Sequence, residues 1–360
     1  MDQDDIVGRL LEFIAADAPN DQAFDALALA LFAYQFQENA PYRKFALARG
    51  KTPRTVRQWE DIPATPINAF KTLDLTCRPP EDAEAVFMTS GTTMGGVRGK
   101  SYHPTLQVYD ASMRRNFADR FMAGFDRMTM GVLFPSPEMM PNSSLAHYLG
   151  LARRHFGVDG GSQLVDGNGI DYPRLFQDLE TAETTGAPYA LLGASFSLVH
   201  ALDEMARIGR RFQLPAGSRI LDTGGFKGQS RELDLDEFYD ALAESFGVPR
   251  ASCINMYGMT ELSTQFYDDG NAVCPSVKSG PHWIRTRAVD PLTGARAPKG
   301  EPGVLAHTDL AHFDIVTTIL TEDVGIEVDG GFLLLGRAKE AEAQGCSMAV
   351  DAFLKAAGAA

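Results

Sequence analysis

The sequence is poor in cysteine. Its four cysteines, Cys77, Cys253, Cys274 and Cys346, are scattered over 360 residues, and none belongs to a CxxC pair. This spacing argues against a cysteine-rich zinc site and against a disulfide framework. Because thiols stay reduced in the cytoplasm, we expect a cytoplasmic protein.

Long apolar runs and an excess of positive charge are missing as well. The longest apolar run, Ala26–Tyr34, has nine residues, whereas a membrane-spanning helix needs about 20. The N-terminal stretch MDQDD lacks the basic start and apolar core of a signal peptide. A net charge of −14 disfavours non-specific binding to nucleic acid or to an anionic membrane. We therefore expect no membrane span, no secretory leader and no nucleic-acid partner.

The composition is otherwise that of an ordinary globular protein, with 44% hydrophobic and 22% charged residues. The length suits one large α/β domain or two unequal ones. Residues 3–48 have apolar positions at helical spacing, which predicts a helical N-terminal segment over about residues 1–50.

Strand-like and helix-like segments alternate through the middle of the chain. Short apolar runs predict strands at Ala85–Met88, Met130–Phe134, Tyr189–Leu192, Arg219–Leu221 and Ser252–Met256. Helical character occurs at Leu106–Phe121, Tyr172–Thr184, Ser195–Ile208 and Glu232–Phe246. This alternation predicts parallel sheet flanked by helices. In such a sheet, ligands bind beyond the carboxyl ends of the strands.

The pattern changes after about residue 280. Short apolar runs separated by Gly, Pro and Asp predict a β-rich, antiparallel part with strands at Trp283–Val289, Val304–His307, Ile315–Leu320 and Phe332–Leu335. A short helix is predicted at Ser347–Ala357.

The stretch Met88–Ser101 has the composition of a phosphate-binding loop. Gly99-Lys100-Ser101 matches the end of a Walker sequence, but Met94 stands where its first glycine is required. The hydroxyls and flexible glycine of residues 89–93 follow a predicted strand and can donate to phosphate oxygens, with Lys100 as a mobile cation. A plain Ser/Thr/Gly turn is the alternative.

A second motif, Tyr257-Gly258-Met259-Thr260-Glu261, follows the predicted strand Ser252–Met256. The Tyr257 ring offers a face for adenine, Thr260 can bond a phosphate, and Glu261 can hold Mg²⁺. The alternative is an ordinary strand end with a surface glutamate.

Three further strand ends carry polar or glycine residues. At Gly224-Gly225-Phe226-Lys227 the backbone can approach a flat ring closely. Asp323 can accept from ribose hydroxyls, and Arg337 can reach ribose or phosphate. For these last two the alternative is a turn with a surface ion pair.

These motifs occur in the order found in the acyl-adenylate-forming enzymes, the acyl-CoA ligase and adenylation-domain superfamily, which the chain resembles in its TSGTT, YGMTE, TED and Gly-Arg pieces. The resemblance implies ATP and Mg²⁺, with Lys100 as a catalytic cation and Glu261 as the metal ligand. It implies that ATP or AMP is bound by Thr89, Ser90, Gly91, Thr92, Thr93, Gly224, Gly225, Phe226, Lys227, Tyr257, Gly258, Met259, Thr260, Asp323 and Arg337.

The chain departs from ordinary members in length, because only 37 residues follow Asp323. In this it resembles the acyl-protein synthetases of bacterial bioluminescence (LuxE-like), which have a similar Gly-Cys-Ser, here Gly345-Cys346-Ser347. The resemblance implies a large adenylate-forming domain over residues 1–323, with its β-rich part at about 280–323. A truncated C-terminal domain over residues 324–360 would then carry Cys346.

The same resemblance implies that a carboxylic acid, in that family a fatty acid, is activated as acyl-AMP. The acyl group then moves to the catalytic Cys346 and on to an acyl-CoA-reductase-like or other acyl-acceptor protein. By residue type alone, Cys346 can equally be a small buried hydrophobe. No base for the thiol can be named, and His103, His147 and His282 are the candidates.

Other functions stay open at this point. Acyl-AMP can pass its acyl group to an external thiol of CoA or of a carrier protein. The glycine-rich loop can belong to a P-loop kinase or NTPase, and the chain can be an inactive scaffold that binds a reductase. The residues Phe134–Pro137, Met139-Met140, His147-Tyr148 and Leu191–Phe196 are candidates for an acyl tunnel or for core.

Overall fold

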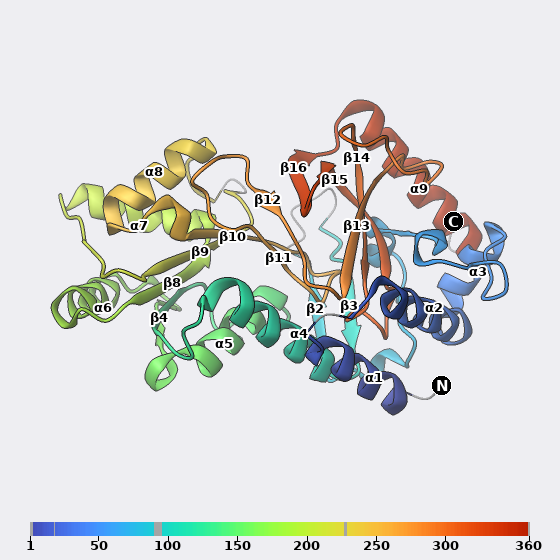
Figure 1. Cartoon of the computed structure of the whole chain (residues 1–360), viewed down its shortest axis with the longest axis horizontal. Helices are drawn as coiled ribbons and strands as arrows, with labels where there is room; N and C mark the ends of the chain where they lie inside the picture. Colours follow the sequence, from blue (N-terminus) through green and yellow to red (C-terminus); the bar gives the residue numbers. More distant parts are fainter. Residues whose placement is uncertain (1–2, 18, 90–95, 227–228, 359–360) are drawn as a thin grey trace. The chain divides into compact units, whose positions relative to one another are not determined.

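The structure is a computed structural model that describes residues 3–17, 19–89, 96–226 and 229–358 (Figure 1). The chain divides into two compact units. Unit 1 comprises residues 1–113, 259–264 and 279–360, and unit 2 comprises residues 114–258 and 265–278. Helices and sheets alternate along the chain, which confirms the predicted α/β class. Within the described ranges, no helix is long and apolar enough to cross a bilayer.

Unit 1 begins with the helices α1 (Gln3–Ala15), α2 (Asp21–Glu38) and α3 (Ala40–Ala48), which confirms the predicted helices of residues 3–48. Asn39 lies between α2 and α3. Its side-chain oxygen accepts from the Tyr42 N–H, and its side-chain amide donates to the Ile315 carbonyl at 3.0 Å. One buried side chain therefore caps a helix and ties it to the β-rich part of the unit.

The predicted antiparallel β-rich part is present in unit 1, where β13 pairs with β14, β14 with β15, and β15 with β16. Its strands are Ile284–Val289 (β13), Pro302–Asp309 (β14), Thr318–Val328 (β15) and Gly331–Arg337 (β16). The two-residue strand β1 (Thr65–Pro66) pairs in parallel with β15. In the sequence, β1 is preceded by the 3-10 turn η1 (Trp59–Asp61) and followed by the 3-10 turns η2 (Ile67–Lys71) and η3 (Pro80–Asp82).

The predicted strand Ala85–Met88 is present as β2. It pairs with β3 (Lys100–His103) in a separate two-stranded antiparallel sheet. The next element is α4 (Gln107–Phe117), and the boundary between the two units falls within it. A short π-helical turn over Ala118–Met122 extends this helix.

Unit 2 contains the parallel sheet predicted from the middle of the chain, in the order β11–β10–β9–β8–β4–β5. The parallel strands are Thr129–Leu133 (β4), Ser162–Gln163 (β5), Tyr189–Ala194 (β8), Arg219–Thr223 (β9) and Cys253–Tyr257 (β10). β11 (Phe266–Tyr267) pairs antiparallel with β10. A small hairpin, Val165–Asp166 (β6) and Gly169–Ile170 (β7), follows β5.

The helices of unit 2 are α5 (Ser144–Phe156), α6 (Tyr172–Thr185), α7 (Ser195–Arg207) and α8 (Leu235–Phe246). Apolar side chains of α6, α7 and α8 form one buried cluster with β8 and β9, including Leu179, Leu198, Leu242, Leu191 and Ile220. Each such side chain stabilises the fold by about 1.5–3 kcal/mol through removal from water. The parallel strands β4, β5, β8, β9 and β10 end at one edge of the sheet, whereas β11 runs antiparallel to β10.

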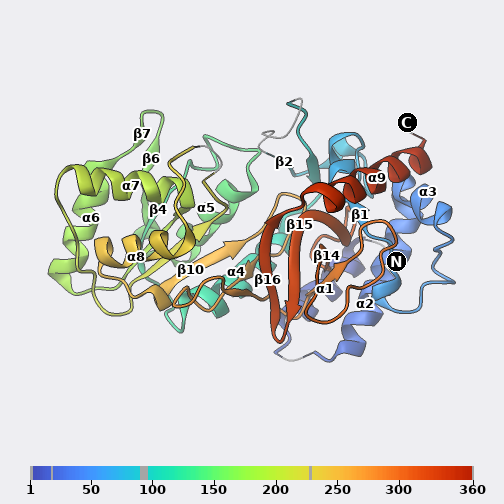
Figure 2. The same cartoon turned by 90° about the horizontal axis from the view of Figure 1, so that it is seen from above.

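The chain closes with α9 (Glu340–Ala357), which packs in unit 1 against α3 and the β15 region (Figure 2). The rings of Phe353 and Phe45 lie 4.4 Å apart, and Lys44 donates to the Ala357 carbonyl at 3.0 Å. The predicted helix began at Ser347, whereas α9 starts seven residues earlier. Residues 324–360 lie within unit 1, and their separation as a functional domain stays a prediction.

Candidate active site

The base of the predicted phosphate loop is closed by Thr89. The Thr89 N–H donates to the Gly99 carbonyl at 3.0 Å, and the Gly99 N–H donates to Thr89 Oγ1 at 2.9 Å. β2 and β3 bring the two residues together, with Met88 opposite Lys100. Lys100 is exposed at the start of β3. The other predicted loop residues, 90–93, lie outside the described residues.

Glu261 lies directly against this loop base. A Cβ atom added to Gly99 would sit 3.3 Å from Glu261 Oε1 and 3.3 Å from Thr89 Cγ2. Residues far apart in the sequence thus meet at a point where only a glycine fits without displacement. Thr89 and Gly99 at the base of the loop and Glu261 of the second motif therefore lie close together in unit 1.

The Glu261 side chain is almost fully buried, with 4% of its surface exposed. Burial raises the pKa of its carboxyl to about 7, and the positive charges of Arg337 and Lys71 only partly offset this. A buried carboxyl that is half-protonated near neutral pH is a group that a bound cation would convert to carboxylate.

Asp323 and Arg337 lie opposite each other on β15 and β16. Arg337 Nε is 3.1 Å from Asp323 Oδ1, and Arg337 Nη1 is 3.3 Å from Glu322 Oε2. The prediction that Asp323 follows a strand is wrong, because β15 continues through it to Val328. The ion pair considered as the alternative is present. The Arg337 side chain is 64% exposed, so the pair adds little stability and its guanidinium remains accessible to a ligand.

In unit 2, the predicted nucleotide residues follow the ends of two neighbouring strands. β9 ends at Thr223 and β10 at Tyr257, and Thr223 Oγ1 donates to the Met256 carbonyl at 2.9 Å. Gly224 has φ +79°, a left-handed conformation that favours glycine. Phe226 packs against a helix of the same unit through the Phe238 ring at 5.7 Å. Lys227 lies outside the described residues.

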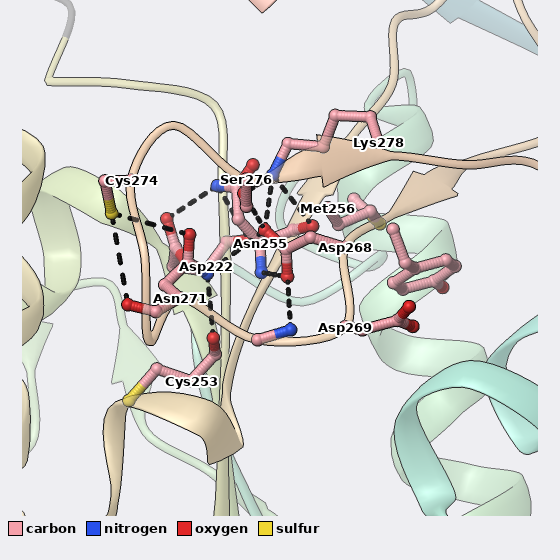
Figure 3. A network of polar contacts seen from close by, with 12 residues as sticks. Asp222, Cys253, Asn255, Met256, Asp268, Asp269, Asn271, Cys274, Ser276 and Lys278 are labelled. Atoms are coloured by element: carbon pink, nitrogen blue, oxygen red, sulfur yellow. Dashed lines mark hydrogen bonds and ion pairs between the residues drawn. The ribbon is translucent and has the colours of Figure 1, made fainter. Parts of the chain in front are cut away.

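Beneath these strand ends is a buried polar network that sequence reasoning missed (Figure 3). The Asp222 carboxylate accepts hydrogen bonds from Asn255 Nδ2 at 2.8 Å and from Ser195 Oγ and Tyr239 Oη at 3.0 Å each. Burial raises the pKa of Asp222 to about 6. A polar residue directly after the apolar run Arg219–Leu221, within strand β9, was the sequence signal that could have revealed it.

The network continues from Asn255 to Asp268 (Figure 3). Asp268 accepts from the Asn255 N–H at 3.0 Å, from Asn271 Nδ2 at 3.0 Å and from Lys278 Nζ at 2.5 Å. Lys278 and Asp268 are both buried. Such fully bonded charges fix the relative position of β9, β10 and the segment 265–278, since removing one partner would leave a buried charge unpaired.

Cys346 lies inside α9 and faces the sheet of unit 1. Only 4% of the residue is exposed, and its Sγ donates to the Thr321 carbonyl at 3.8 Å. It packs in an apolar cluster with Val304 and Leu320. Burial, and secondarily the negative charges of nearby carboxylates, raise the pKa of the thiol to about 11. In this position the thiol is neutral at physiological pH.

The predicted site residues fall in both units. Unit 1 holds Thr89, Lys100, Met259, Thr260, Glu261, Asp323, Arg337 and Cys346, and unit 2 holds Gly224, Gly225, Phe226, Tyr257 and Gly258. Of the candidate bases, His103 is buried in unit 1, His282 Nε2 lies 2.7 Å from the Phe13 carbonyl in the same unit, and His147 belongs to α5 in unit 2.

The described residues contain no group of three or more His, Cys, Asp or Glu side chains that could enclose a metal ion. A single carboxyl such as Glu261 fits Mg²⁺ better than a metal that needs an all-protein site. Magnesium is commonly held by one or two carboxylates together with phosphates and water. The residues present are therefore compatible with Mg²⁺ carried on a nucleotide.

Curated relatives cover most of the chain. The long-chain-fatty-acid–luciferin-component ligase of Vibrio harveyi is 24% identical over 342 residues, which is 92% of this chain and 88% of the relative. The protein of the same name from Aliivibrio fischeri is 23% identical over 306 residues, 84% of this chain and 78% of the relative.

Solved structures show the same fold. A 2-hydroxyisobutyryl-CoA ligase in an open conformation with 2-HIB-AMP and CoA is similar with a TM-score of 0.62 and 15% identity, over 88% of this chain and 74% of that chain. ATP-bound MatB from Rhodopseudomonas palustris is similar with a TM-score of 0.52 and 18% identity. That match covers 72% of this chain and about half (49%) of MatB.

The family comparison spans nearly the whole sequence. Residues 3–354 match the family described as acyl-protein synthetase, LuxE. The resemblance inferred from the motifs is thereby confirmed: the chain is a ligase-type enzyme that belongs to the LuxE acyl-protein synthetase family.

Proposed function

We propose that the protein uses ATP to activate a fatty acid as acyl-AMP and then transfers the acyl group to its own Cys346. The observation that carries the proposal is the contact of the loop base, Thr89 and Gly99, with the buried carboxyl of Glu261. The relatives named long-chain-fatty-acid ligases support a fatty acid as substrate. The similar folds solved with ATP and with an acyl-AMP support the nucleotide chemistry.

In the first half-reaction a carboxylate oxygen of the acid attacks the α-phosphate of ATP, and pyrophosphate leaves. Residues 89–93 and Lys100 would donate to the crowded phosphate oxygens, and Glu261 would hold Mg²⁺. When bound, Mg²⁺ supplies positive charge that offsets the charge of the phosphates. Gly224, Gly225, Phe226 and Lys227, together with Tyr257, would flank the adenine.

Further residues of the two motifs hold the rest of the nucleotide. The backbone of Gly258, Met259 and Thr260 would lie along the phosphates, with the Thr260 hydroxyl as a donor. Asp323 accepts from the ribose hydroxyls. Arg337, whose guanidinium is exposed, donates to ribose or phosphate.

In the second half-reaction the Cys346 sulfur attacks the carbonyl carbon of acyl-AMP. The bond from that carbon to the phosphate oxygen breaks, AMP leaves, and a thioester forms while the thiol proton passes to a base or to water. Because the thiol is buried and its pKa is about 11, this step requires Cys346 to leave the position seen here.

The burial of Cys346 also favours a second candidate, acyl transfer to an external thiol of CoA or of a carrier protein. In that case Cys346 is a core residue of α9. Both candidates share acyl-AMP formation, and they differ in which thiol releases AMP.

The test separates the two half-reactions. ATP–pyrophosphate exchange across a panel of acids measures activation, and a clickable fatty acid with ATP and Mg²⁺ measures acylation of the protein. We expect a hydroxylamine-labile label on the wild type and on Cys274→Ala. Cys346→Ala is expected to lose the label while still catalysing exchange. Label retained on Cys346→Ala, or AMP release only after CoA is added, would overturn the self-acylation proposal.

The acyl acceptor after Cys346 is proposed to be an acyl-CoA-reductase-like protein. The cytoplasmic location stays a prediction.

A further inference from the structure

The segment that carries Glu261 is a short, irregular piece of unit 1. Residues 259–264 belong to unit 1, whereas the residues on either side of them in the sequence belong to unit 2. The segment forms turns and bends rather than a helix or strand. Its position therefore depends on the contacts that it makes with the rest of unit 1.

The main contact of this segment is the carboxylate of Asp309, the fully buried last residue of β14. Its Oδ2 accepts from the backbone N–H groups of Ser263 and Thr264 at 2.8 Å each. Its Oδ1 accepts from Thr264 Oγ1 at 2.7 Å and from the Ala311 N–H at 3.0 Å. Three of these four hydrogen bonds hold residues that lie two and three positions after Glu261.

Other buried side chains of unit 1 join this contact. Trp283 Nε1 donates to Thr264 Oγ1 at 3.1 Å and to Ser112 Oγ at 2.9 Å. His312 Nδ1 lies 2.9 Å from Ser263 Oγ. The segment is thus attached to α4, to the residue before β13 and to the turn after β14.

A buried carboxylate is an expensive way to fill space, because a charge loses its hydration on burial. Burial raises the pKa of Asp309 to about 6, and the hydrogen bonds from Thr264, Ser263 and Ala311 offset part of the rise. Asp309 is therefore mainly ionised at pH 7 and above. An apolar side chain would avoid the cost of burial, but it could not bind two consecutive N–H groups.

We propose that Asp309 is a positioning residue, which fixes residues 259–264 so that the Glu261 carboxyl faces the loop base and receives the Mg²⁺ of the nucleotide. The inference rests on the proposed function, in which Glu261 would hold this Mg²⁺. Asp309 acts only through Ser263 and Thr264. It lies at the end of a strand in a sheet, so the support that it gives is rigid.

The first measurement is calorimetry of ATP binding, once with Mg²⁺ and once with EDTA instead. Fatty acid is omitted, so that no activation takes place. Wild type and Asp309→Asn are compared with Asp314→Asn, the matched control. Asp314 is also a buried carboxyl of unit 1 whose pKa burial raises to about 6, but it accepts from Tyr34 Oη and Gln3 Nε2 at 2.9 Å each, on α2 and α1.

For the wild type we expect Mg²⁺ to tighten ATP binding. Asp309→Asn has one acceptor oxygen where the carboxylate has two, and in either orientation its NH₂ group would face a backbone N–H. We expect this variant to lose about fivefold of the gain from Mg²⁺, or about 1 kcal/mol, the net value of a typical hydrogen bond. Its affinity for ATP in EDTA should match the wild type. Asp314→Asn should be destabilised as well, yet keep the full gain from Mg²⁺.

A milder pair of variants keeps the test decisive if Asp309→Asn does not fold. Thr264→Val removes the hydroxyl that donates to Asp309 Oδ1 and should lose part of the gain from Mg²⁺. Thr264→Ser retains this hydroxyl and should retain the gain.

The second measurement, amide hydrogen exchange of residues 259–264, needs no nucleotide. We expect the Ser263 and Thr264 amides to exchange faster in Asp309→Asn and at the wild-type rate in Asp314→Asn. Unchanged exchange in Asp309→Asn overturns the proposal, and so does a loss of Mg²⁺ gain no larger than in Asp314→Asn. If wild type binds ATP no better with Mg²⁺ than with EDTA, the metal assignment of the proposed function fails, and hydrogen exchange still decides whether Asp309 holds the segment.

Discussion

Replacing the carboxyl of Glu261 by an amide should stabilise the ligand-free protein at pH 8 and have no such effect below about pH 4.5. The pKa of this carboxyl rises from 4.5 to about 7 on folding, because the side chain is buried. At 1.36 kcal/mol per pKa unit, ionising it in the folded protein costs about 3 kcal/mol. Its own backbone N–H bonds the carboxylate, and the amide oxygen of glutamine can accept the same bond.

The direction of this pH dependence of stability follows from proton binding. Between pH 4.5 and 7 the folded state binds more protons at Glu261 than the unfolded state does, so wild-type stability falls as pH rises through this window. Glu261→Gln lacks this loss. The difference in free energy of unfolding between variant and wild type should therefore grow by about 3 kcal/mol across the window.

Unfolding is followed at pH 4.5 and pH 8 for the wild type, Glu261→Gln and Glu301→Gln, the last being an exposed glutamate before β14. A difference between Glu261→Gln and wild type that is the same at both pH values would refute the reasoning. So would an equal gain in Glu301→Gln. Addition of ATP and Mg²⁺ is expected to stabilise the wild type and Glu301→Gln, and to stabilise Glu261→Gln much less, because the proposed metal ligand is then absent.

Local signals in the sequence identified most of the regular elements. α8 follows Asp234, whose side chain accepts from the Glu237 N–H at 2.8 Å, and it ends at Gly247 with φ +67°. These are the cap residues that mark helix ends in a sequence. The order of the motifs likewise identified the family, because the motifs are short and can be read without knowledge of distant contacts; Thr89 follows β2 directly, whereas Asp323 lies within β15.

The sequence analysis did not predict α5 and predicted too short an α9, and each of these helices contains an interior glycine. α5 was not predicted, although Ser143 caps it, and it contains Gly150; the start of α9 was placed after Gly345. Glycine inside a helix costs about 1 kcal/mol relative to alanine. In the structure a Cβ atom at either position would lie 2.7 Å from a proline ring, Pro137 for Gly150 and Pro291 for Gly345. The glycines serve a close tertiary contact, which a single sequence does not display.

The buried network could not be predicted for a related reason. Asp222, Asp268 and Lys278 lie on different segments, and each becomes interpretable only through its partners. In the sequence alone, a lone Asp or Lys most often lies on the surface. Their ion pairs and hydrogen bonds offset the free-energy cost of burying these groups. Those contacts depend on the register of the sheet and on the path of the loops that bring the segments together, which are long-range properties of the fold.

Three further substitutions test separate parts of the structure. Gly99→Val is expected to lower ATP–pyrophosphate exchange more than tenfold, because the added side chain meets the buried carboxyl below the loop; Gly8→Ala, in an open position of α1, should leave exchange unchanged. Asp222→Asn should destabilise the protein by about 1–3 kcal/mol in urea unfolding. The asparagine has one acceptor oxygen where the carboxylate has two, and its NH₂ group would face the groups that donate to Asp222 in the wild type. Asp203→Asn, which breaks only an exposed ion pair, should cost about 1 kcal/mol or less. Gly345→Ala should raise the rate at which the α9 thiol reacts with iodoacetamide, since its methyl group would overlap a proline ring and push the helix away from the sheet. Because burial is the main cause of the raised pKa of the thiol, displacement of the helix should lower the pH midpoint of the reaction as well as raise its plateau rate. An unchanged plateau would mean that the fit of α9 against the turn after β13 does not hold the thiol in place.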